Sequence, residues 1–238
     1  MSWFESAVDA VVSGNLAALD SLLGDHPELV HERSAAVHRA TLLHYTAANG
    51  VEEARQRTPA NAVSVAEMLL RAGAEVDALA GTYGGGTSET TLNLLVCSWP
   101  PAEAGVQAAL IETLLDFGAA IEGVEGDGSP LITALAFGYT EAAETLARRG
   151  ARVETVVAAA GLGREDLVQR MVDRDGRLHA DVPLVHVHWL RVSPEQQANL
   201  ELALTWASVH RRTGVAEFLL RHGVPPGARD QWGMAVAR

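Results

Sequence analysis

The segment TLLHYTAANG at residues 41–50 and the segment VAEMLLRAGAEVD at residues 65–77 decide the fold of this 238-residue chain. The second segment recurs as LIETLLDFGAAIE at 110–122, AAETLARRGARVE at 142–154 and VAEFLLRHGV at 215–224. In each copy the apolar residues recur at the spacing of one helix face, and a glycine follows them. Glycine adopts without strain the left-handed conformation that ends many helices. Each copy therefore predicts a short amphipathic helix that stops at its glycine.

The segment at residues 41–50 predicts a further helix ahead of one of these amphipathic helices. A second copy, SPLITALAFG, occupies residues 129–138. Thr41 and Ser129 are residue types that cap helix N-termini, and Pro130 suits the first helical turn. The small alanines of both copies allow neighbouring helices to pack closely. The chain therefore predicts pairs of short helices, repeated along its length.

This pattern resembles the ankyrin repeat, whose first helix reads T-P-L-H-x-A-A-x-x-G and whose second ends in L-L-x-x-G-A. Residues 41–50 match that signature at Thr41, Leu43, His44, Ala47, Ala48 and Gly50. The spacing of 32 residues from Gly118 to Gly150 is close to the family's period of about 33. The resemblance implies an all-α fold, an ankyrin-repeat solenoid of stacked helix-turn-helix units with protruding loops. It also implies that His44 is structural and ties neighbouring turns together.

The pattern divides the chain into six approximate repeats and a short remainder. The repeats are 1–35, 36–81, 82–124, 125–154, 155–195 and 196–230, and residues 231–238 look like the start of an incomplete or capping repeat. Because a stacked array has one continuous core, we expect a single domain over residues 1–238. Residues 51–60 are extra in the second repeat, and residues 100–105 are extra in the third repeat. Residues 176–195 predict a long irregular segment, and Arg211 stands where the pattern expects glycine.

The composition excludes several classes of function. The net charge is −12, and all 18 basic residues are arginine. Without lysine the chain has no Walker A phosphate loop and no Schiff-base lysine. Between Ala72 and Ala147 there are eleven acidic residues and no arginine. Such a surface repels phosphates and anionic lipids, so we expect neither nucleic acid nor a membrane as a partner. It is either a solvated face that aids solubility or a docking surface for a cationic partner.

A single cysteine, Cys97, rules out an intramolecular disulfide and a multi-cysteine zinc site. It lies among Leu94, Leu95 and Val96, which predicts a small buried core residue inside a first helix. The N-terminal residues do not read as a signal peptide, and no apolar run reaches the roughly 18 residues of a membrane span. We therefore expect a cytoplasmic protein.

Two departures from the repeat predict a candidate binding site. They are the insertion at residues 51–60 and the glycine-rich turn at residues 81–91. In the ankyrin fold such turns project beside the concave face formed by the first helices. Together they predict a polar pocket or a partner-binding surface, lined by Tyr45, Arg55, Arg57, Tyr83, Gly84, Gly85, Thr87, Asn93 and Trp99. The alternative is that both segments are tolerated surface loops.

The remaining motifs predict neither catalysis nor a cofactor. The chain has no G-x-S-x-G elbow, no H-E-x-x-H and no acidic metal loop. In the segment VHVHW at 185–189, His186 and His188 share one side of an extended strand, which metal ligands often do. Solvated histidines beside a packed Trp189 are the simpler interpretation. We therefore expect no catalytic residue, no metal and no cofactor.

Three hypotheses of function follow. The first is a non-catalytic scaffold that recognises a protein partner, of basic character, through its fingers and concave face. The alternative is a small-molecule or enzymatic site formed by residues 51–60 and 81–91. The third is self-association through an apolar face around Trp232 and Met234. The ankyrin resemblance implies the first.

Overall fold

The structure is a computed structural model of the chain, and it describes residues 2–82, 88–187 and 189–234. Helices hold 52% of the residues and strands 3%, so the predicted all-α class is confirmed. The internal contacts divide the chain into two compact parts, Met1–Gly126 (unit 1) and Asp127–Arg238 (unit 2). The single domain expected from the repeat therefore stays a prediction.

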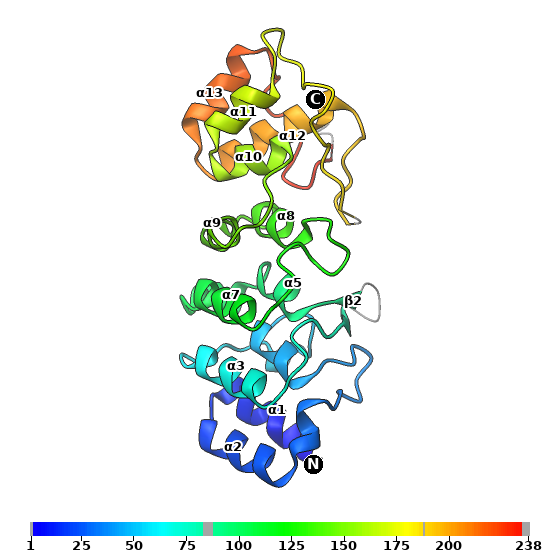
Figure 1. Cartoon of the computed structure of the whole chain (residues 1–238), viewed down its shortest axis with the longest axis vertical. Coiled ribbons are helices and arrows are strands. Elements are labelled where there is room, and N and C mark those ends of the chain that lie inside the picture. Colours follow the sequence, from blue (N-terminus) through cyan, green and yellow to red (C-terminus); the bar gives the residue numbers. More distant parts are fainter. Residues whose placement is uncertain (1, 83–87, 188, 235–238) are drawn as a thin grey trace. The chain divides into compact units, whose positions relative to one another are not determined.

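Unit 1 contains three helical pairs and one small hairpin (Figure 1). Its elements are α1 (Trp3–Ser13), α2 (Leu16–Asp25), the 3-10 helices η1 (Pro27–Val30), η2 (Leu42–Ala47) and η3 (Glu53–Arg55), α3 (Ala62–Arg71), β1 (Ala80–Gly81), β2 (Ser88–Glu89), α5 (Thr91–Leu95), α6 (Trp99–Glu103) and α7 (Gln107–Asp116). Strands β1 and β2 pair antiparallel, with Ala80 opposite Glu89 and Gly81 opposite Ser88.

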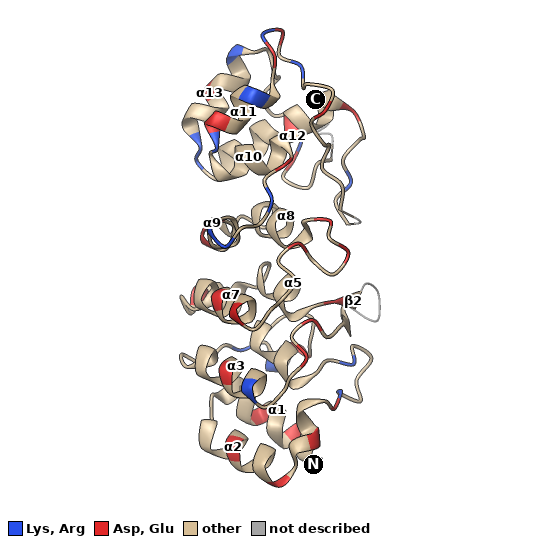
Figure 2. Cartoon of the chain, in the orientation of Figure 1, with Lys and Arg blue, Asp and Glu red and all other residues tan. Residues whose placement is uncertain are grey.

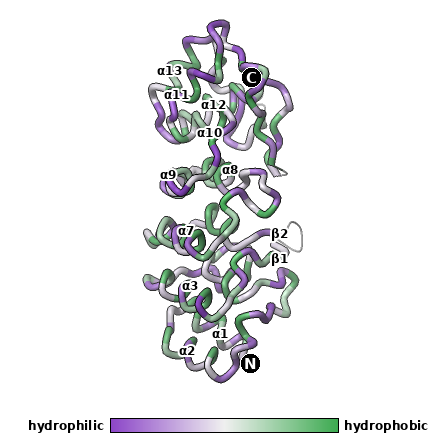
Figure 3. The backbone as a smooth tube through the Cα atoms, viewed as in Figure 1, coloured by the Kyte–Doolittle hydropathy of each residue, from purple (hydrophilic) through white to green (hydrophobic). Residues whose placement is uncertain are grey.

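The pairs of unit 1 stack through their apolar faces. The first helix of each pair contacts the next first helix, α1 with η2 and η2 with α5, and the second helices follow as α2, α3 and α7. Figure 3 shows hydrophobic and hydrophilic residues interleaved along these helices, as an amphipathic pattern requires. Leu19, Leu69 and Ile111 are fully buried where successive second helices meet the core. The stacked helix-turn-helix arrangement that the repeat predicts is thus present in this unit.

The first helix predicted from residues 41–50 is a 3-10 helix and not an α-helix. All six residues of η2 are buried, and Ala48, the residue after it, has a left-handed backbone with φ 49°. The tighter winding ends within two turns, as is usual for 3-10 helices. Consequently η2 is short, and the chain leaves it through Asn49 and Gly50 into the insertion.

Unit 2 contains three further pairs. They are α8 (Ser129–Ala136) with α9 (Thr140–Arg148), α10 (Val156–Leu162) with α11 (Glu165–Met171), and α12 (Gln196–Val209) with α13 (Thr213–Arg221). Helix α10 lies between α8 and α12. Its residues from Val156 to Gly161 are all buried. A Cβ atom on Gly161 would lie 2.9 Å from Leu135 Cδ2, so α8 and α10 approach closely only because glycine stands there.

The predicted irregular segment is confirmed over the residues that the structure describes. Between residues 176 and 195, positions other than 188 hold neither helix nor strand. One β-bridge, Val172 to Leu178, closes its beginning. The buried amide oxygen of Asn199 accepts a hydrogen bond from the Val185 backbone N–H at 2.8 Å and so fixes this segment on α12. Arg211 has φ 58°, the left-handed conformation that the pattern assigns to glycine.

Candidate functional site

His44 is a structural link between two neighbouring repeats of unit 1. Its Nδ1 accepts hydrogen bonds from the Thr41 hydroxyl at 2.8 Å and the Thr41 N–H at 3.2 Å, so Nε2 carries the proton. That Nε2–H donates to the Glu89 carbonyl oxygen, 3.4 Å away on strand β2. Burial lowers the pKa of His44 to about 4, so the ring is neutral near neutral pH. Because both ring nitrogens are engaged, His44 cannot serve as a general base.

Arg55 fastens the insertion to helix α1. Its Nη2 lies 2.6 Å from Glu5 Oε2 and 3.3 Å from Asp9 Oδ1, two carboxylates one turn apart on α1. Its Nη1 lies 3.7 Å from Glu52 Oε1. Burial disfavours the charged guanidinium, but the hydrogen bond and attraction of Glu5 outweigh it and raise the pKa of Arg55. The guanidinium that was predicted to bind a ligand therefore already holds three carboxylates of its own chain.

Tyr45 lies inside the unit and not on an open pocket wall. It is completely buried, and its hydroxyl donates to Glu52 Oε2 at 3.1 Å. Burial raises the pKa of Tyr45 to about 12. The same Glu52 oxygen lies 3.3 Å from Nε2 of His38, whose ring meets that of Tyr45 edge to face. A partner cannot reach Tyr45 unless the insertion moves.

The Glu52 carboxylate connects Arg55 to the pair of Tyr45 and His38. Burial acts to raise its pKa, but a backbone hydrogen bond, the Tyr45 hydroxyl and the nearby His38 and Arg55 together lower it. His38 Nδ1 accepts the Ala40 N–H at 3.1 Å, so the basic nitrogen of this second histidine is also occupied. The cluster of Tyr45, Glu52 and Arg55 is therefore a polar support for the insertion. Its geometry offers no free base or nucleophile.

The hairpin carries only part of the predicted site. Asn93, near the start of α5, donates from Nδ2 to Glu89 Oε2 at 2.5 Å. Thr90 caps α5 by accepting the Asn93 N–H at 3.2 Å. The Gly81 N–H donates to the His38 carbonyl at 2.8 Å and joins the hairpin to the loop before it. Four other predicted site residues, Tyr83, Gly84, Gly85 and Thr87, lie outside the described residues.

Trp99 lies just after the first helix of its repeat, α5. It begins α6, a separate short helix, because Pro100 and Pro101 follow it and proline is favoured in the first turn of a new helix. The indole is 62% exposed. Arg57 is also exposed, on the insertion. Of the predicted residues, the structure therefore brings together Tyr45 and Arg55, while Asn93 and Trp99 lie at separate places.

Cys97 follows α5, in the turn before α6, and not inside the helix. Its Sγ accepts a hydrogen bond from Asn49 Nδ2 at 3.2 Å and contacts the carbonyls of Asn93 and Leu94. Cys97 is half-buried, and this burial is the main reason why the pKa of its thiol is raised to about 12. The prediction of a fully buried residue inside the helix is therefore wrong, although the raised pKa keeps the thiol protonated near neutral pH.

Sequence reasoning missed the residues that hold the insertion. Glu5 and Asp9 are four residues apart on a helix, and Glu52 and His38 flank the repeat signature. Two carboxylates at this spacing weakly repel each other on a helix, but the spacing does not show which cation offsets the repulsion. The sequence shows arginines at positions 55 and 57, but it does not show that Arg55 forms ion pairs while Arg57 is exposed.

The net charge of the chain is carried by unit 1 alone. Residues 1–126 contain five arginines and seventeen acidic residues, a net charge of −12, and residues 127–238 contain thirteen of each. Figure 2 shows the acidic residues dispersed over unit 1, whereas both signs alternate in unit 2. Three of the five arginines in unit 1 are engaged: Arg33 donates to the Leu79 carbonyl, and Arg55 and Arg71 pair with glutamates. The acidic charge is therefore weakly compensated within this unit.

Three loops of unit 1 project as fingers, and each exposes an aliphatic side chain. The fingers are residues 31–41, the described parts of the hairpin (78–82 and 88–90), and residues 119–126. Val37 is 71% exposed, Leu79 40% and Val124 52%. Val37 is the second residue of a turn in which the Arg39 N–H donates to the Ala36 carbonyl. Val124 is the second residue of a turn in which the Gly126 N–H donates to the Gly123 carbonyl. Proline is the residue favoured at this second turn position, so the turns themselves do not require an exposed valine.

Paired helices, stacked first helices, projecting fingers and the threonine–histidine link of the first helix are now all established. The chain has an ankyrin-repeat fold. No known family model matches the sequence, and no curated protein matches it closely enough to be a relative. Among solved structures, the human ASB11 ankyrin repeat domain is similar in backbone, with a TM-score of 0.49 and 20% identity over 99% of this chain and 89% of that one. This likeness describes the backbone and says nothing of what the chain binds.

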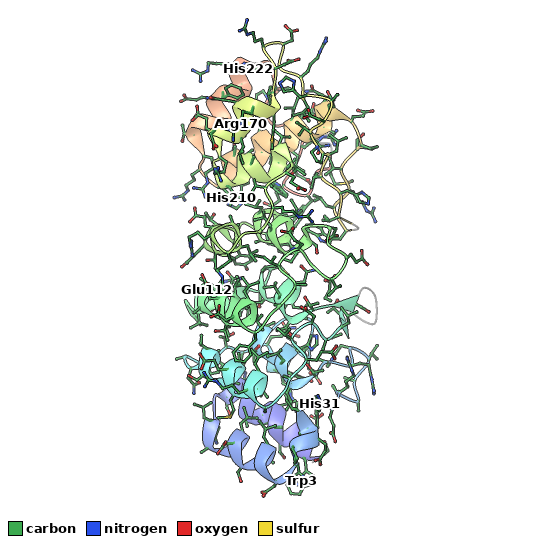
Figure 4. The ribbon with its side chains drawn as sticks, in the orientation of Figure 1. Trp3, His31, Glu112, Arg170, His210 and His222 are labelled. Carbon is green, nitrogen blue, oxygen red and sulfur yellow. The ribbon has the colours of Figure 1, made fainter. Side chains whose placement is uncertain are left out.

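In the ankyrin repeats of unit 2, His210 is a second buried histidine that links segments distant in the sequence. It lies just beyond α12, beside the α8–α9 pair (Figure 4). Its Nε2–H donates to the Leu135 carbonyl at 2.8 Å, and its Nδ1 lies 2.7 Å from the Thr140 hydroxyl. Burial lowers its pKa, so this ring is also neutral. Next to it, Arg212 donates to the Gly161 carbonyl and pairs with Glu144 at 2.7 Å.

Unit 2 also carries a cluster of aromatic rings at its surface, which we name the aromatic cluster. It consists of Phe137, at the end of α8, Trp189, in the irregular segment, and Trp232, near the C-terminus. Their ring centroids are 4.8 to 6.4 Å apart, and each pair meets edge to face. Phe137 is 43% exposed and Trp232 36%. Three segments that are distant in the sequence thus meet at one surface.

No metal site is evident among the residues that the structure describes, since these contain no group of three or more His, Cys, Asp or Glu side chains able to hold an ion. His186 is exposed between the buried Val185 and Val187, and His188 lies outside the described residues. Within the same described part, no helix is long and apolar enough to cross a membrane.

Proposed function

We propose that unit 1 is a binding surface for a protein partner, and that it recognises a basic segment that also carries apolar side chains. The observation that carries the proposal is the confinement of the whole net charge of −12 to residues 1–126. A field of this size attracts a cationic partner and raises its rate of association. The ankyrin fold supplies a rigid surface, so binding loses little ordering entropy.

The fingers supply the apolar part of this surface. Val37 and Leu79 lie on adjacent fingers that are joined by the bond from the Gly81 N–H to the His38 carbonyl. Val124 lies on the third finger, whose Ala120 N–H is held by the Asp77 carboxylate at 3.1 Å. A partner segment with alternating basic and aliphatic residues matches this surface. Its aliphatic side chains would contact the exposed valines and leucine, and its basic side chains would pair with exposed carboxylates such as Glu125. Isolated exposed aliphatic residues are common, so the proposal depends on their occurrence on successive fingers.

The small-molecule alternative has less support. It relies on Arg55 and Tyr45, whose polar groups are satisfied by Glu5, Asp9 and Glu52. We also propose a cytoplasmic location, because one cysteine without a disulfide partner fits a reducing compartment.

The test is titration of the full chain with three fluorescent peptides: one of alternating arginine and leucine, one of glutamate and leucine, and one of arginine and serine. The first should bind most tightly, its affinity should fall steeply with salt, and the second should not bind. The double variant Glu75→Gln/Glu125→Gln should weaken binding several-fold. Val124→Ser should weaken binding of the arginine–leucine peptide and leave that of the arginine–serine peptide unchanged. The matched control in unit 2, Glu195→Gln/Glu217→Gln, should leave binding unchanged.

Two results would overturn the proposal. One is binding of the acidic peptide as tightly as the basic one. The other is an equal effect of the unit 1 variant and its unit 2 control.

A further inference from the structure

The exposed apolar side chains of unit 2 concentrate at one place. Besides the aromatic cluster, Met234 is 48% exposed two residues after Trp232, and Val209 is 40% exposed. A Cβ atom on Gly138, the neighbour of Phe137, would lie 4.0 Å from Val209 Cγ1, so Val209 adjoins the cluster. We name Phe137, Trp189, Val209, Trp232 and Met234 together the apolar patch. Of the large apolar side chains exposed among the described residues of unit 2, only Leu220 lies elsewhere.

The C-terminal part of the patch is fixed by hydrogen bonds. Asp230 Oδ1 accepts the N–H groups of Trp232 and Met234, both at 2.9 Å. The buried Trp206 donates from Nε1 to the Gln231 carbonyl at 2.9 Å. A Cβ atom on Gly233 would lie 2.5 Å from Val192 Cγ2, so this turn packs directly on the irregular segment. The exposed rings are therefore held in place before any partner arrives, and a contact made by them costs little ordering entropy.

The charges around the patch are compensated. Arg229 pairs with Glu201 at 3.0 Å, both side chains being only 14% exposed, and its Nη1 donates to the Gly233 carbonyl. Unit 2 as a whole contains thirteen arginines and thirteen acidic residues. Two copies of this surface can therefore approach without net repulsion. Two copies of unit 1, each with a net charge of −12, repel one another.

We propose that the apolar patch is the interface at which a second copy of this chain binds, patch to patch. A symmetric dimer contact places the same surface on both copies, so it must be self-complementary. Rings that already meet edge to face within one copy present edges and faces to the other, and aromatic pairs prefer this geometry. An apolar patch of this kind on a soluble chain marks an interaction site. The difference in charge between the units selects unit 2 as the self-associating surface.

The test is sedimentation equilibrium of the full 238-residue chain over a wide range of concentration, at low and at high salt. We expect a monomer–dimer equilibrium that high salt leaves intact or strengthens, since the contact is apolar. Met234→Glu places like charges opposite each other in the dimer and should raise the dissociation constant at least tenfold. Phe137→Glu should do the same. The matched control is Leu220→Glu, an exposed apolar side chain of the same unit outside the patch, and it should leave the dimer unchanged.

Circular dichroism and thermal melting show whether each variant is folded. Three outcomes overturn the proposal. The first two are a wild-type chain that is monomeric at every concentration, and a dimer that Leu220→Glu disrupts and the folded Met234→Glu leaves intact. A dimer that dissociates as salt is added also overturns it, because such a contact is ionic.

Discussion

The Nδ1 atom of His210 lies 2.7 Å from the hydroxyl of Thr140, and the opposite ring nitrogen donates to the carbonyl of Leu135. The carbonyl can only accept, so Nδ1 is the acceptor and the Thr140 hydroxyl is the donor. This neutral, fully bonded imidazole connects the turn after α12 to the α8–α9 pair. In unit 1 the neutral His44 likewise uses both ring nitrogens, joining its own Thr41 to the carbonyl of Glu89 in the next repeat.

The first prediction concerns the hydrogen bond from the Thr140 hydroxyl to His210 Nδ1. Thr140→Val keeps the side-chain shape and leaves the buried Nδ1 without a donor, so we expect a loss of about 1 to 2 kcal/mol in the free energy of unfolding. Urea denaturation followed by circular dichroism measures it. The control is Thr133→Val, since the buried hydroxyl of Thr133 has no hydrogen-bond partner. That change should be neutral or stabilising, and equal losses for both variants would contradict the assignment.

The second prediction is a dependence of stability on pH. Burial lowers the pKa of His44 to about 4 and also lowers that of His210. In the unfolded chain both histidines return to about 6.5, so below that pH the unfolded state binds more protons. Stability is therefore full above about pH 6.5 and falls as the pH drops towards about 4, with His44 alone contributing about 3 kcal/mol.

Urea midpoints measured across that range check this dependence. Because carboxylates such as Glu52 act in the same direction, the slope must be compared between the wild type and His44→Asn. The variant is expected to be less stable throughout and to have the shallower slope. His186→Asn, at an exposed position, should keep the wild-type slope. A steep slope retained in His44→Asn would contradict the account.

The third prediction tests the attachment of the insertion to α1. Arg55→Ala removes the partner of Glu5 and Asp9, and we expect a loss of about 1 to 2 kcal/mol together with faster amide exchange over residues 51–60. Hydrogen exchange followed by mass spectrometry locates the effect. Arg57→Ala, at an exposed neighbouring arginine, should leave exchange unchanged. The attachment is disproved if both variants exchange alike.

The fourth prediction concerns the thiol of Cys97, whose pKa is raised to about 12 mainly by burial. Near neutral pH almost none of it is thiolate, which is the reactive form. In the folded protein we expect labelling by a disulfide reagent at least a hundredfold slower than in the urea-unfolded chain, in keeping with about 3 units between this pKa and that of a free thiol. Equal rates in the two states would show an accessible thiolate.

The fifth prediction concerns backbone strain after α12. Arg211 has φ 58°, a conformation that costs an ordinary residue about 1 kcal/mol. Arg211→Gly should therefore stabilise unit 2 by about 0.5 to 1 kcal/mol. The converse change, Gly163→Ala at φ 74°, should destabilise it, because its Cβ would also lie 2.8 Å from Arg212 Cδ. Thermal melts of both variants decide the sign.

Much of the fold could be predicted because the repeat encodes it locally. Each Gly that ends a second helix, such as Gly73 or Gly150, has the positive φ that its place in the pattern requires. The structural role of His44 followed from the resemblance and agrees with its three hydrogen bonds. The 3-10 form of η2 did not follow, since its apolar pattern is compatible with either helix type.

The candidate site was predictable only as a location. The insertion at 51–60 was visible as extra residues, but its contacts with Glu5 and Asp9 join parts of the chain some fifty residues apart. No local pattern specifies such a pairing, so Arg55 was interpreted as a ligand-binding group. The aromatic cluster escaped for the same reason, because Phe137, Trp189 and Trp232 meet only through the packing of unit 2.

The unequal partition of charge implies that the two halves respond differently to ionic strength. Added salt screens the mutual repulsion of the seventeen carboxylates in residues 1–126 and should raise the melting temperature of that half. The other half, balanced between cations and anions, has little repulsion to screen. Raising the salt concentration from millimolar to molar should therefore shift the melting temperature of residues 1–126 relative to that of residues 127–238.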